Sequence, residues 1–213
     1  MICPICEKRP AKRFCPAKGE KICAICCGRE REVTIDCPQH CSYLITAHSY
    51  EAEHRPRISR DQLPYPKIEF HVEFIYERWP VVSGIAATIL NFHAQHKDLN
   101  DPATLSALEA LAETYRTLGT GIYYERPPDL PVAHALYGAL AEFLQKLRKE
   151  EAERAGFPVL KESDILNLLV FLLRVGKQET NGRPRARAFL GFLRERFPLP
   201  ATVASDRSRI IVP

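Results

Sequence analysis

The spacing of apolar and polar residues predicts helices over much of the second half of the chain. From residue 101 onward, apolar side chains recur every three or four positions, which is the period of one helix face. Four helices are predicted in this half, over 101–118, 129–155, 163–175 and 185–197. The third is apolar nearly all round, so we expect it to lie at the centre of a bundle.

The ends of these helices carry residues that favour helix starts and stops. Asp101 and Pro102 suit the cap and first turn of the first helix, and Gly119 follows its last apolar residue. Gly156 and Gly176 are expected to end the second and third helices. The four helices therefore have recognisable boundaries.

Earlier in the chain the pattern permits more than one reading. A helix is predicted to start at Pro38, with Cys37 as its cap and Cys41 one turn later, and to stop before Pro56. Residues 68–76 alternate as a strand would, but a helix from about Val72 is the favoured prediction. Residues 79–96 carry no formal charge, yet they include proline, glycine, asparagine and histidines, so we expect a bundle helix and not a membrane span.

All eight cysteines lie near the N-terminus, and the rest of the chain has none. They are Cys3, Cys6, Cys15, Cys23, Cys26, Cys27, Cys37 and Cys41. Two cysteines separated by two residues can bend around one ion, and structural Zn²⁺ takes four such ligands. Eight thiols therefore predict two zinc ions.

The order of the cysteines favours two interleaved sites, in which the first pair joins the third. The first site then consists of Cys3, Cys6, Cys23 and Cys26. The second consists of Cys15, Cys27, Cys37 and Cys41, with His40 as an alternative ligand in place of Cys27. Nearby lysines and arginines would balance the negative charge of bound thiolates.

This cysteine pattern resembles the cross-braced double-zinc fingers of the B-box and HIT type. The resemblance rests on Cys3-x2-Cys6, Cys15, Cys23-x2-Cys26 and the terminal pair Cys37 and Cys41, and it covers only the cysteine-rich segment. A B-box usually has a ligand at the position of Lys18 and ends on histidines. Because such fingers are docking modules in larger assemblies, the resemblance implies binding of a partner rather than catalysis.

Other uses of the thiols are weaker hypotheses. An iron–sulfur cluster is an alternative, although the compact C-x2-C-x2-C run of bacterial ferredoxins is missing. A thiol redox centre at Cys23 and Cys26 would need a strand–helix context that the pattern does not indicate. The start of the chain lacks the pattern of a secretory signal, so a reducing cytoplasm is expected, where disulfides are rare.

The net charge of +4 is unevenly distributed along the chain. Residues 1–31 carry eight Lys and Arg against three Glu, and residues 174–213 carry nine against three acidic residues, whereas the middle is acidic. Two basic ends could hold an anionic partner or could attract the middle of the same chain. Candidate partner-binding residues are Lys8, Arg9, Lys12, Arg13, Arg187 and Arg194.

No set of residues in the helical part predicts catalysis. The chain has no Walker phosphate loop, no Gly-x-Gly-x-x-Gly and no Gly-x-Ser-x-Gly motif. His93 and His96 are three residues apart but have no evident third metal ligand, so they are expected either at the edge of the core or in solvent.

The sequence therefore predicts a mainly α protein in which a small cysteine-rich zinc module precedes a helical bundle. The expected parts are the zinc module with its exit helix (1–55), a linker (56–68), the bundle (69–200) and a tail (201–213). The favoured function is a non-enzymatic, cytoplasmic zinc-binding adaptor that docks a protein partner. No membrane association is expected. DNA or RNA binding through the basic zinc module and the basic C-terminal helix is the alternative.

Overall fold

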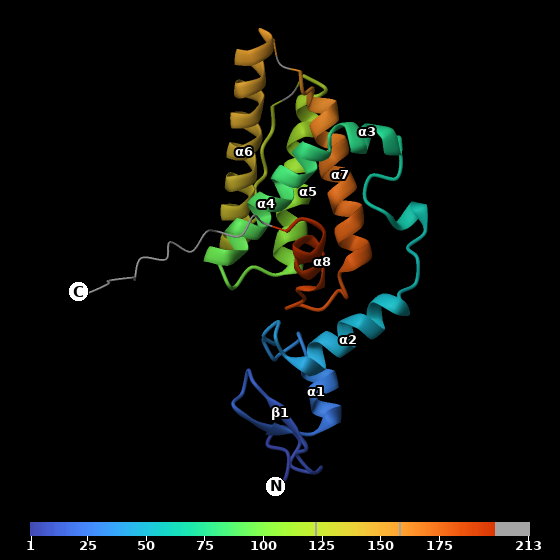
Figure 1. Cartoon of the computed structure of the whole chain (residues 1–213), viewed down its shortest axis with the longest axis vertical. Coiled ribbons are helices and arrows are strands. Elements are labelled where there is room, and N and C mark those ends of the chain that lie inside the picture. Colours follow the sequence, from blue (N-terminus) through green and yellow to red (C-terminus); the bar gives the residue numbers. More distant parts are fainter. Residues whose placement is uncertain (122, 158, 199–213) are drawn as a thin grey trace, which may run out of the picture.

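The computed structural model describes residues 1–121, 123–157 and 159–198, and it is mainly helical. This part of the chain contains eight α-helices and one two-stranded antiparallel sheet. Figure 1 shows a small N-terminal region below a bundle of helices, with helix α2 (Ser42–Glu53) between them. We call residues 1–41 the finger and the described residues of 72–197 the bundle. The predicted fold class is confirmed, while the predicted tail, with a possible strand over 208–212, lies outside the described residues.

The finger is built from a short hairpin followed by a short helix. Strands β1 (Arg13–Cys15) and β2 (Glu20–Ile22) pair with Phe14 opposite Lys21, and Gly19 turns the chain with a φ of 67° that glycine adopts without strain. Helix α1 (Ala24–Glu30) follows directly. Six of the ten buried residues in the cluster that includes this region are cysteines. Sulfur therefore occupies much of the space that aliphatic side chains fill in a larger domain.

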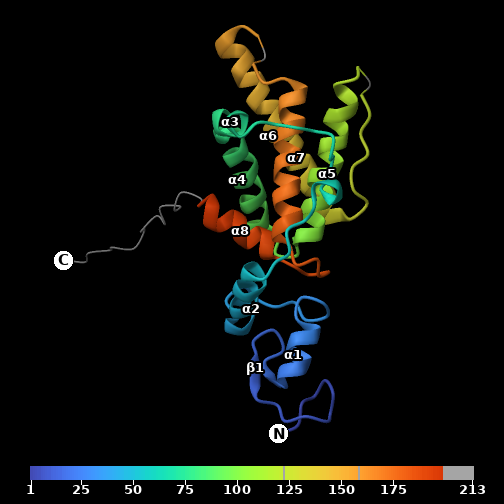
Figure 2. The ribbon, with the colours of Figure 1, turned by 90° about the vertical axis from the view of Figure 1, so that its right-hand side faces the viewer.

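The bundle has a conventional apolar core. Its helices are α3 (Val72–Glu77), α4 (Trp79–Gln95), α5 (Asp101–Leu118), α6 (Pro131–Ala155), α7 (Glu162–Glu179) and α8 (Ala188–Arg196). Helix α5 packs against α6 and α7, and α8 closes one end against α4, α5 and α7 (Figures 1 and 2). Leu108, Leu140 and Leu173 are fully buried in one continuous cluster.

The four helices predicted in the second half of the chain are confirmed, but α6 begins at Pro131, α7 at Glu162 and α8 at Ala188, and two end residues have other roles than predicted. Asn100 caps α5 by accepting a hydrogen bond from the backbone N–H of Ala103, whereas Asp101 turns inward and accepts from Phe189 and Leu190 at the start of α8. Helix α7 runs past Gly176 to Glu179. A Cβ at Gly176 would lie 2.5 Å from Leu105 Cδ2, so this glycine permits close packing and does not end the helix.

The segment between finger and bundle follows α7 closely. Arg174 donates hydrogen bonds to the backbone carbonyls of Pro64, Tyr65 and Ile68. Gln178 bonds with the backbone of Pro56 and Ile58. Residues 56–68 are therefore attached along one side of the bundle, where Figure 2 shows them running upward from α2.

Helix, not strand, follows Val72, as favoured from the sequence. Residues 79–95 of the uncharged stretch form the whole of α4, whose buried residues face the bundle. In the described part of the chain, no helix has both the length and the apolarity that crossing a bilayer requires.

Candidate metal centre

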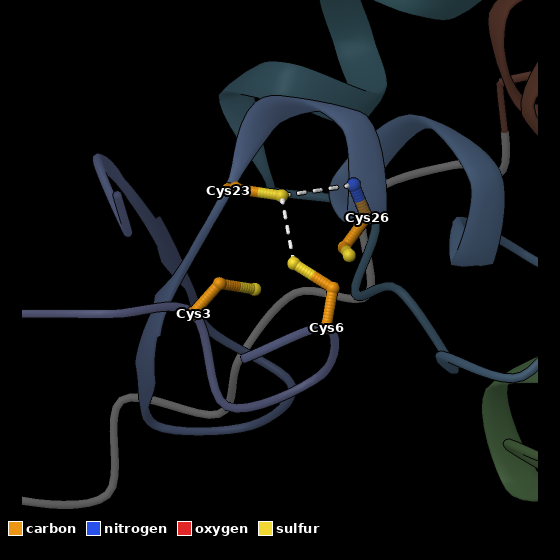
Figure 3. A group of neighbouring side chains, drawn as sticks. All are labelled: Cys3, Cys6, Cys23 and Cys26. Carbon is orange, nitrogen blue, oxygen red and sulfur yellow. Dashed lines mark hydrogen bonds between the residues drawn. The ribbon is translucent and has the colours of Figure 1, made fainter. Parts of the chain in front are cut away.

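Four cysteine sulfurs meet at one point in the finger. The Sγ atoms of Cys3, Cys6, Cys23 and Cys26 all lie within 4.8 Å of one another (Figure 3). Cys3, Cys23 and Cys26 are buried and Cys6 is half-buried. The structure thus brings together the four cysteines of the first predicted site, from two segments of the chain, and this group can hold a metal ion.

Two local structures hold the sulfurs in place. The first is a tight turn in which the N–H of Cys3 donates to Arg9 and the N–H of Glu7 donates back to Cys3, with Glu7 in the left-handed region. The second is the start of α1, where Cys23 is the N-cap and its sulfur accepts a hydrogen bond of 3.3 Å from the N–H of Cys26. The first turn of α1 therefore fixes the position of the Cys23 sulfur.

The separation of the sulfurs fits one tetrahedral ion. With metal–sulfur bonds of about 2.3 Å, two ligands of a tetrahedral Zn²⁺ lie roughly 3.8 Å apart. The Cys6 and Cys23 sulfurs are 3.9 Å apart. A disulfide needs about 2.05 Å, and all eight cysteines, every one within the described residues, are free thiols.

The protein environment prepares some of these thiols to lose a proton. The backbone N–H groups of Lys8 and Arg9 lower the pKa of Cys6 to about 6. Burial alone would raise the pKa of Cys3, but backbone donors, chiefly Cys23 and Cys6, lower it overall. Burial and the neighbouring thiols raise the pKa of Cys26 to about 12. In the absence of metal the group therefore keeps a proton that a bound cation must displace.

The other four cysteines do not form a second group of this kind among the described residues. Cys15, Cys37 and Cys41 are buried in the same cluster as the first site, whereas Cys27 is half-buried and the alternative ligand His40 is exposed. Burial, together with nearby Cys41, Glu32 and Cys15, raises the pKa of Cys37. The second predicted site therefore has buried thiols but no completed ligand set.

The prediction that a helix starts at Pro38 is wrong. Residues 38–40 form a turn, in which the N–H of Cys41 donates to Pro38, and α2 begins only at Ser42 with Cys41 as its N-cap. The two cysteines therefore do not lie one helical turn apart on a common face, because Pro38 starts a turn here and not a helix.

A buried glutamate that the sequence did not single out joins the finger to the bundle. Glu32 is only 1% exposed, and its carboxylate accepts hydrogen bonds from His48 Nε2, Asn181 Nδ2 and the N–H of Arg187. Burial would raise the pKa of Glu32, but His48 and the other donors lower it overall. We call Glu32 and these three partners the seam.

The seam could not be predicted from the sequence because its residues are far apart along the chain. Asn181 and Glu32 are separated by 149 positions, and Glu32 stands in a run of charges that resembles a solvated surface. The Asn-Gly-Arg-Pro turn at 181–184 was the one local signal, since a turn of this kind presents side chains from a fixed backbone.

The candidate partner-binding residues fall into two groups. Lys8, Arg9 and Lys12 are exposed on the finger, while Arg13 lies over the ring of Tyr43 at 4.7 Å. At the other end of the chain, Arg187 is 9% exposed and its guanidinium binds Asp36 and two backbone carbonyls. Exposed Arg194 contacts Gln39.

No protein-family model, curated protein or solved structure matches this chain. The cysteine geometry and the surfaces around it are therefore the basis for a functional assignment.

Proposed function

We propose that this protein is a non-enzymatic adaptor whose zinc-bound finger docks a protein partner. The observation that carries the proposal is the group of four cysteine sulfurs within 4.8 Å of one another. A small module with few buried aliphatic residues gains its folding energy from a bound ion, and its surface is then available for recognition. The resemblance of the cysteine pattern to B-box and HIT-type fingers, which are docking modules, supports this proposal.

Zinc is the favoured metal because the four ligands are thiolates placed for a single ion. Tetrahedral sulfur sites suit zinc or iron, but an iron–sulfur cluster inserts several atoms between the cysteine sulfurs and would hold them farther apart. The second zinc ion of the proposal uses the buried thiols of Cys15, Cys37 and Cys41, with Cys27 or His40 as fourth ligand. This site would be completed by a local rearrangement of the 37–41 turn when the ion binds.

The exposed side of the finger supports docking by a mixed apolar and basic surface. Phe14 is 54% exposed and lies opposite Lys21 in the hairpin, so both side chains stand on the same face. Ile2 and Ile25 are also exposed elsewhere on the finger. Large apolar residues exposed on so small a module are typical of recognition surfaces, and the basic neighbours favour a partner segment that is acidic and apolar.

The test uses cross-linking of zinc-loaded protein to partners in cell extract, followed by mass spectrometry. We expect one partner whose cross-links map to the finger, and we expect Phe14→Ser to remove it while zinc content stays unchanged. Val72→Ser, which alters an equally exposed apolar residue of the bundle, is the matched control. Partner capture that is insensitive to Phe14→Ser and to zinc removal would contradict the proposal.

Nucleic-acid binding remains a second candidate because Lys8, Arg9 and Lys12 are exposed on the same module. It predicts that affinity for DNA or RNA falls steeply with salt and falls further when these three residues are neutralised together. Fluorescence anisotropy with labelled oligonucleotides measures both effects. If the triple variant binds as tightly as the wild type, this candidate fails.

A further inference from the structure

A second recognition feature lies where the finger meets the bundle. A pocket of about 400 Å³ opens between the finger residues 36–40, the C-terminal end of α4 and helix α8. Its polar and charged lining residues are Asp36, Gln39, His40, His93, Lys97, Arg187 and Arg194. This volume is in the range of sites that hold small molecules.

Positive charge dominates the pocket. Lys97, Arg187 and Arg194 line it against a single carboxylate, Asp36. Arg187 is fixed, because its Nε and Nη2 donate to the carbonyls of Leu99 and Lys97 and its Nη1 pairs with Asp36. These contacts use three of the five N–H donors of the guanidinium. Two N–H donors of Arg187 are therefore left for another acceptor.

His93 adds a buried polar group that the protein does not satisfy. The residue is 7% exposed, and its Nδ1 is buried without a hydrogen-bond partner among the described residues. Burial, followed by the charges of Arg187, Arg194 and Lys97, lowers the pKa of His93 to about 4, so the ring is neutral at pH 7. A buried unpaired polar atom costs about 1–3 kcal/mol and calls for an explanation.

We propose that this pocket binds a small phosphate-bearing anion, either inorganic phosphate or a phosphomonoester. An arginine fork and a lysine ammonium are the groups that proteins use for phosphate oxygens. Three cationic side chains favour an anion over a free cation, and the polar lining does not suit an apolar ligand. The inference does not use the docking surface of the finger, but the pocket shares Cys37 and His40 with the second zinc site of the proposed function.

Because the lining comes from both regions, the anion would link them. Asp36, Gln39 and His40 belong to the finger, whereas His93 lies on α4, Lys97 in the turn after α4 and Arg194 on α8. A ligand held by both sides stabilises their contact by mass action. We therefore expect phosphate to raise the melting temperature of the zinc-loaded protein.

The binding test is isothermal titration calorimetry with inorganic phosphate, at constant ionic strength, on the zinc-loaded full chain. We expect one saturable site. Lys97→Gln and Arg194→Gln should each weaken binding about tenfold, which corresponds to loss of one charge-assisted hydrogen bond. Neither side chain anchors the fold, since the Lys97 backbone carbonyl makes its structural contact and Arg194 binds only Gln39 among the described residues. Arg196→Gln, on the same helix but outside the pocket, is the control and should bind phosphate normally.

Two further measurements identify the ligand and the site. Glycerol 3-phosphate, titrated in the same way, distinguishes a phosphomonoester site from one for free phosphate by its tighter binding. The ¹H–¹⁵N resonances of the His93 ring should shift on phosphate addition in the wild type and the control but not in the two pocket variants. Unsaturable binding, or equal weakening by Arg196→Gln, would overturn the proposal. So would an oligonucleotide that binds through Arg194 and is not displaced by phosphate.

Discussion

The finger and the bundle hold themselves together by different means. The bundle buries a continuous set of aliphatic and aromatic side chains from six helices. The finger cluster buries Ile22, Ile35 and Leu44, and most of its other buried residues are cysteines. Apolar burial contributes about 25 cal/mol per Å², so the bundle can be stable without metal, whereas the proposed function requires that an ion stabilise the finger.

The largest expected effect breaks the finger alone. Chelation of zinc, or Cys23→Ser, should unfold residues 1–41 and leave the bundle helices intact, because apparent zinc-binding energies in small fingers are about 10–16 kcal/mol. Hydrogen exchange measured by mass spectrometry resolves the two regions. Phe14→Ser, which alters an exposed finger residue, serves as a control that should keep the finger protected. Loss of bundle protection together with finger protection would contradict a separate origin of stability.

The converse change weakens the bundle alone. Leu140→Ala removes a fully buried side chain from α6 and should destabilise the bundle by about 3 kcal/mol, through lost burial and a cavity. Zinc content should stay at the wild-type value. Chemical denaturation followed by circular dichroism measures the first effect and elemental analysis the second. Loss of zinc from this variant would show that the finger depends on the bundle core.

The seam tests how the two regions are coupled. Glu32→Gln should weaken their contact by about 2 kcal/mol, because one buried and two half-buried donors lose the charged acceptor they share. Limited proteolysis within residues 181–187 should then become faster, while Glu20→Gln, at an exposed position, should change nothing.

The seam also predicts a dependence on pH. The folded-state pKa of Glu32 lies below its ordinary value of 4.5. Its contribution is therefore fully present above pH 4.5 and is lost as the pH falls through the lower folded value. Acid should accelerate cleavage of the wild type in that range and have little further effect on Glu32→Gln. An equal acid response in both proteins would contradict this role.

Packing between helices provides a smaller test within the bundle. Gly176→Ala should cost about 1–2 kcal/mol, because the added methyl would lie 2.5 Å from Leu105 Cδ2 and 3.0 Å from Phe189 Cε1. Gly138→Ala, where nothing lies within 4 Å of the added methyl, should instead stabilise α6 by up to about 1 kcal/mol. Thermal denaturation of the two variants distinguishes these signs. Stabilisation by both would show that α7 approaches its neighbours less closely.

The smallest effect concerns proton release by the metal centre. At pH 7 the thiol of Cys26, with its pKa of about 12, keeps a proton that zinc must displace. Below about pH 6 Cys6 also takes up a proton, so each zinc ion must displace one proton more. The binding free energy of zinc should then weaken by a further amount of about 1.4 kcal/mol for each pH unit. Competition with a chromophoric chelator across this range measures the slope. A slope that stays constant through pH 6 would contradict the assignment to Cys6.

Features that depend on local spacing could be predicted from the sequence, whereas features that depend on contacts between distant residues could not. Helix periodicity is local, so α5, α6, α7 and α8 could be predicted from spacing. The Cys-x2-Cys turns are also local. Pairing Cys3 and Cys6 with Cys23 and Cys26 required in addition the assumption that the cysteine pairs are interleaved. The seam and the pocket proposed to bind phosphate arise between residues far apart in the chain. Asp101 and Gly176 have roles set by neighbours that spacing does not reveal.

The central claim is that one metal ion bound by four cysteines holds the finger. Native mass spectrometry of anaerobically purified wild-type and Cys23→Ser protein, with elemental analysis, tests it most directly. We predict zinc on the wild type and loss of at least one ion from the Cys23→Ser variant. Wild-type protein that carries disulfides and no metal, or a metal content unchanged by Cys23→Ser, would contradict the account.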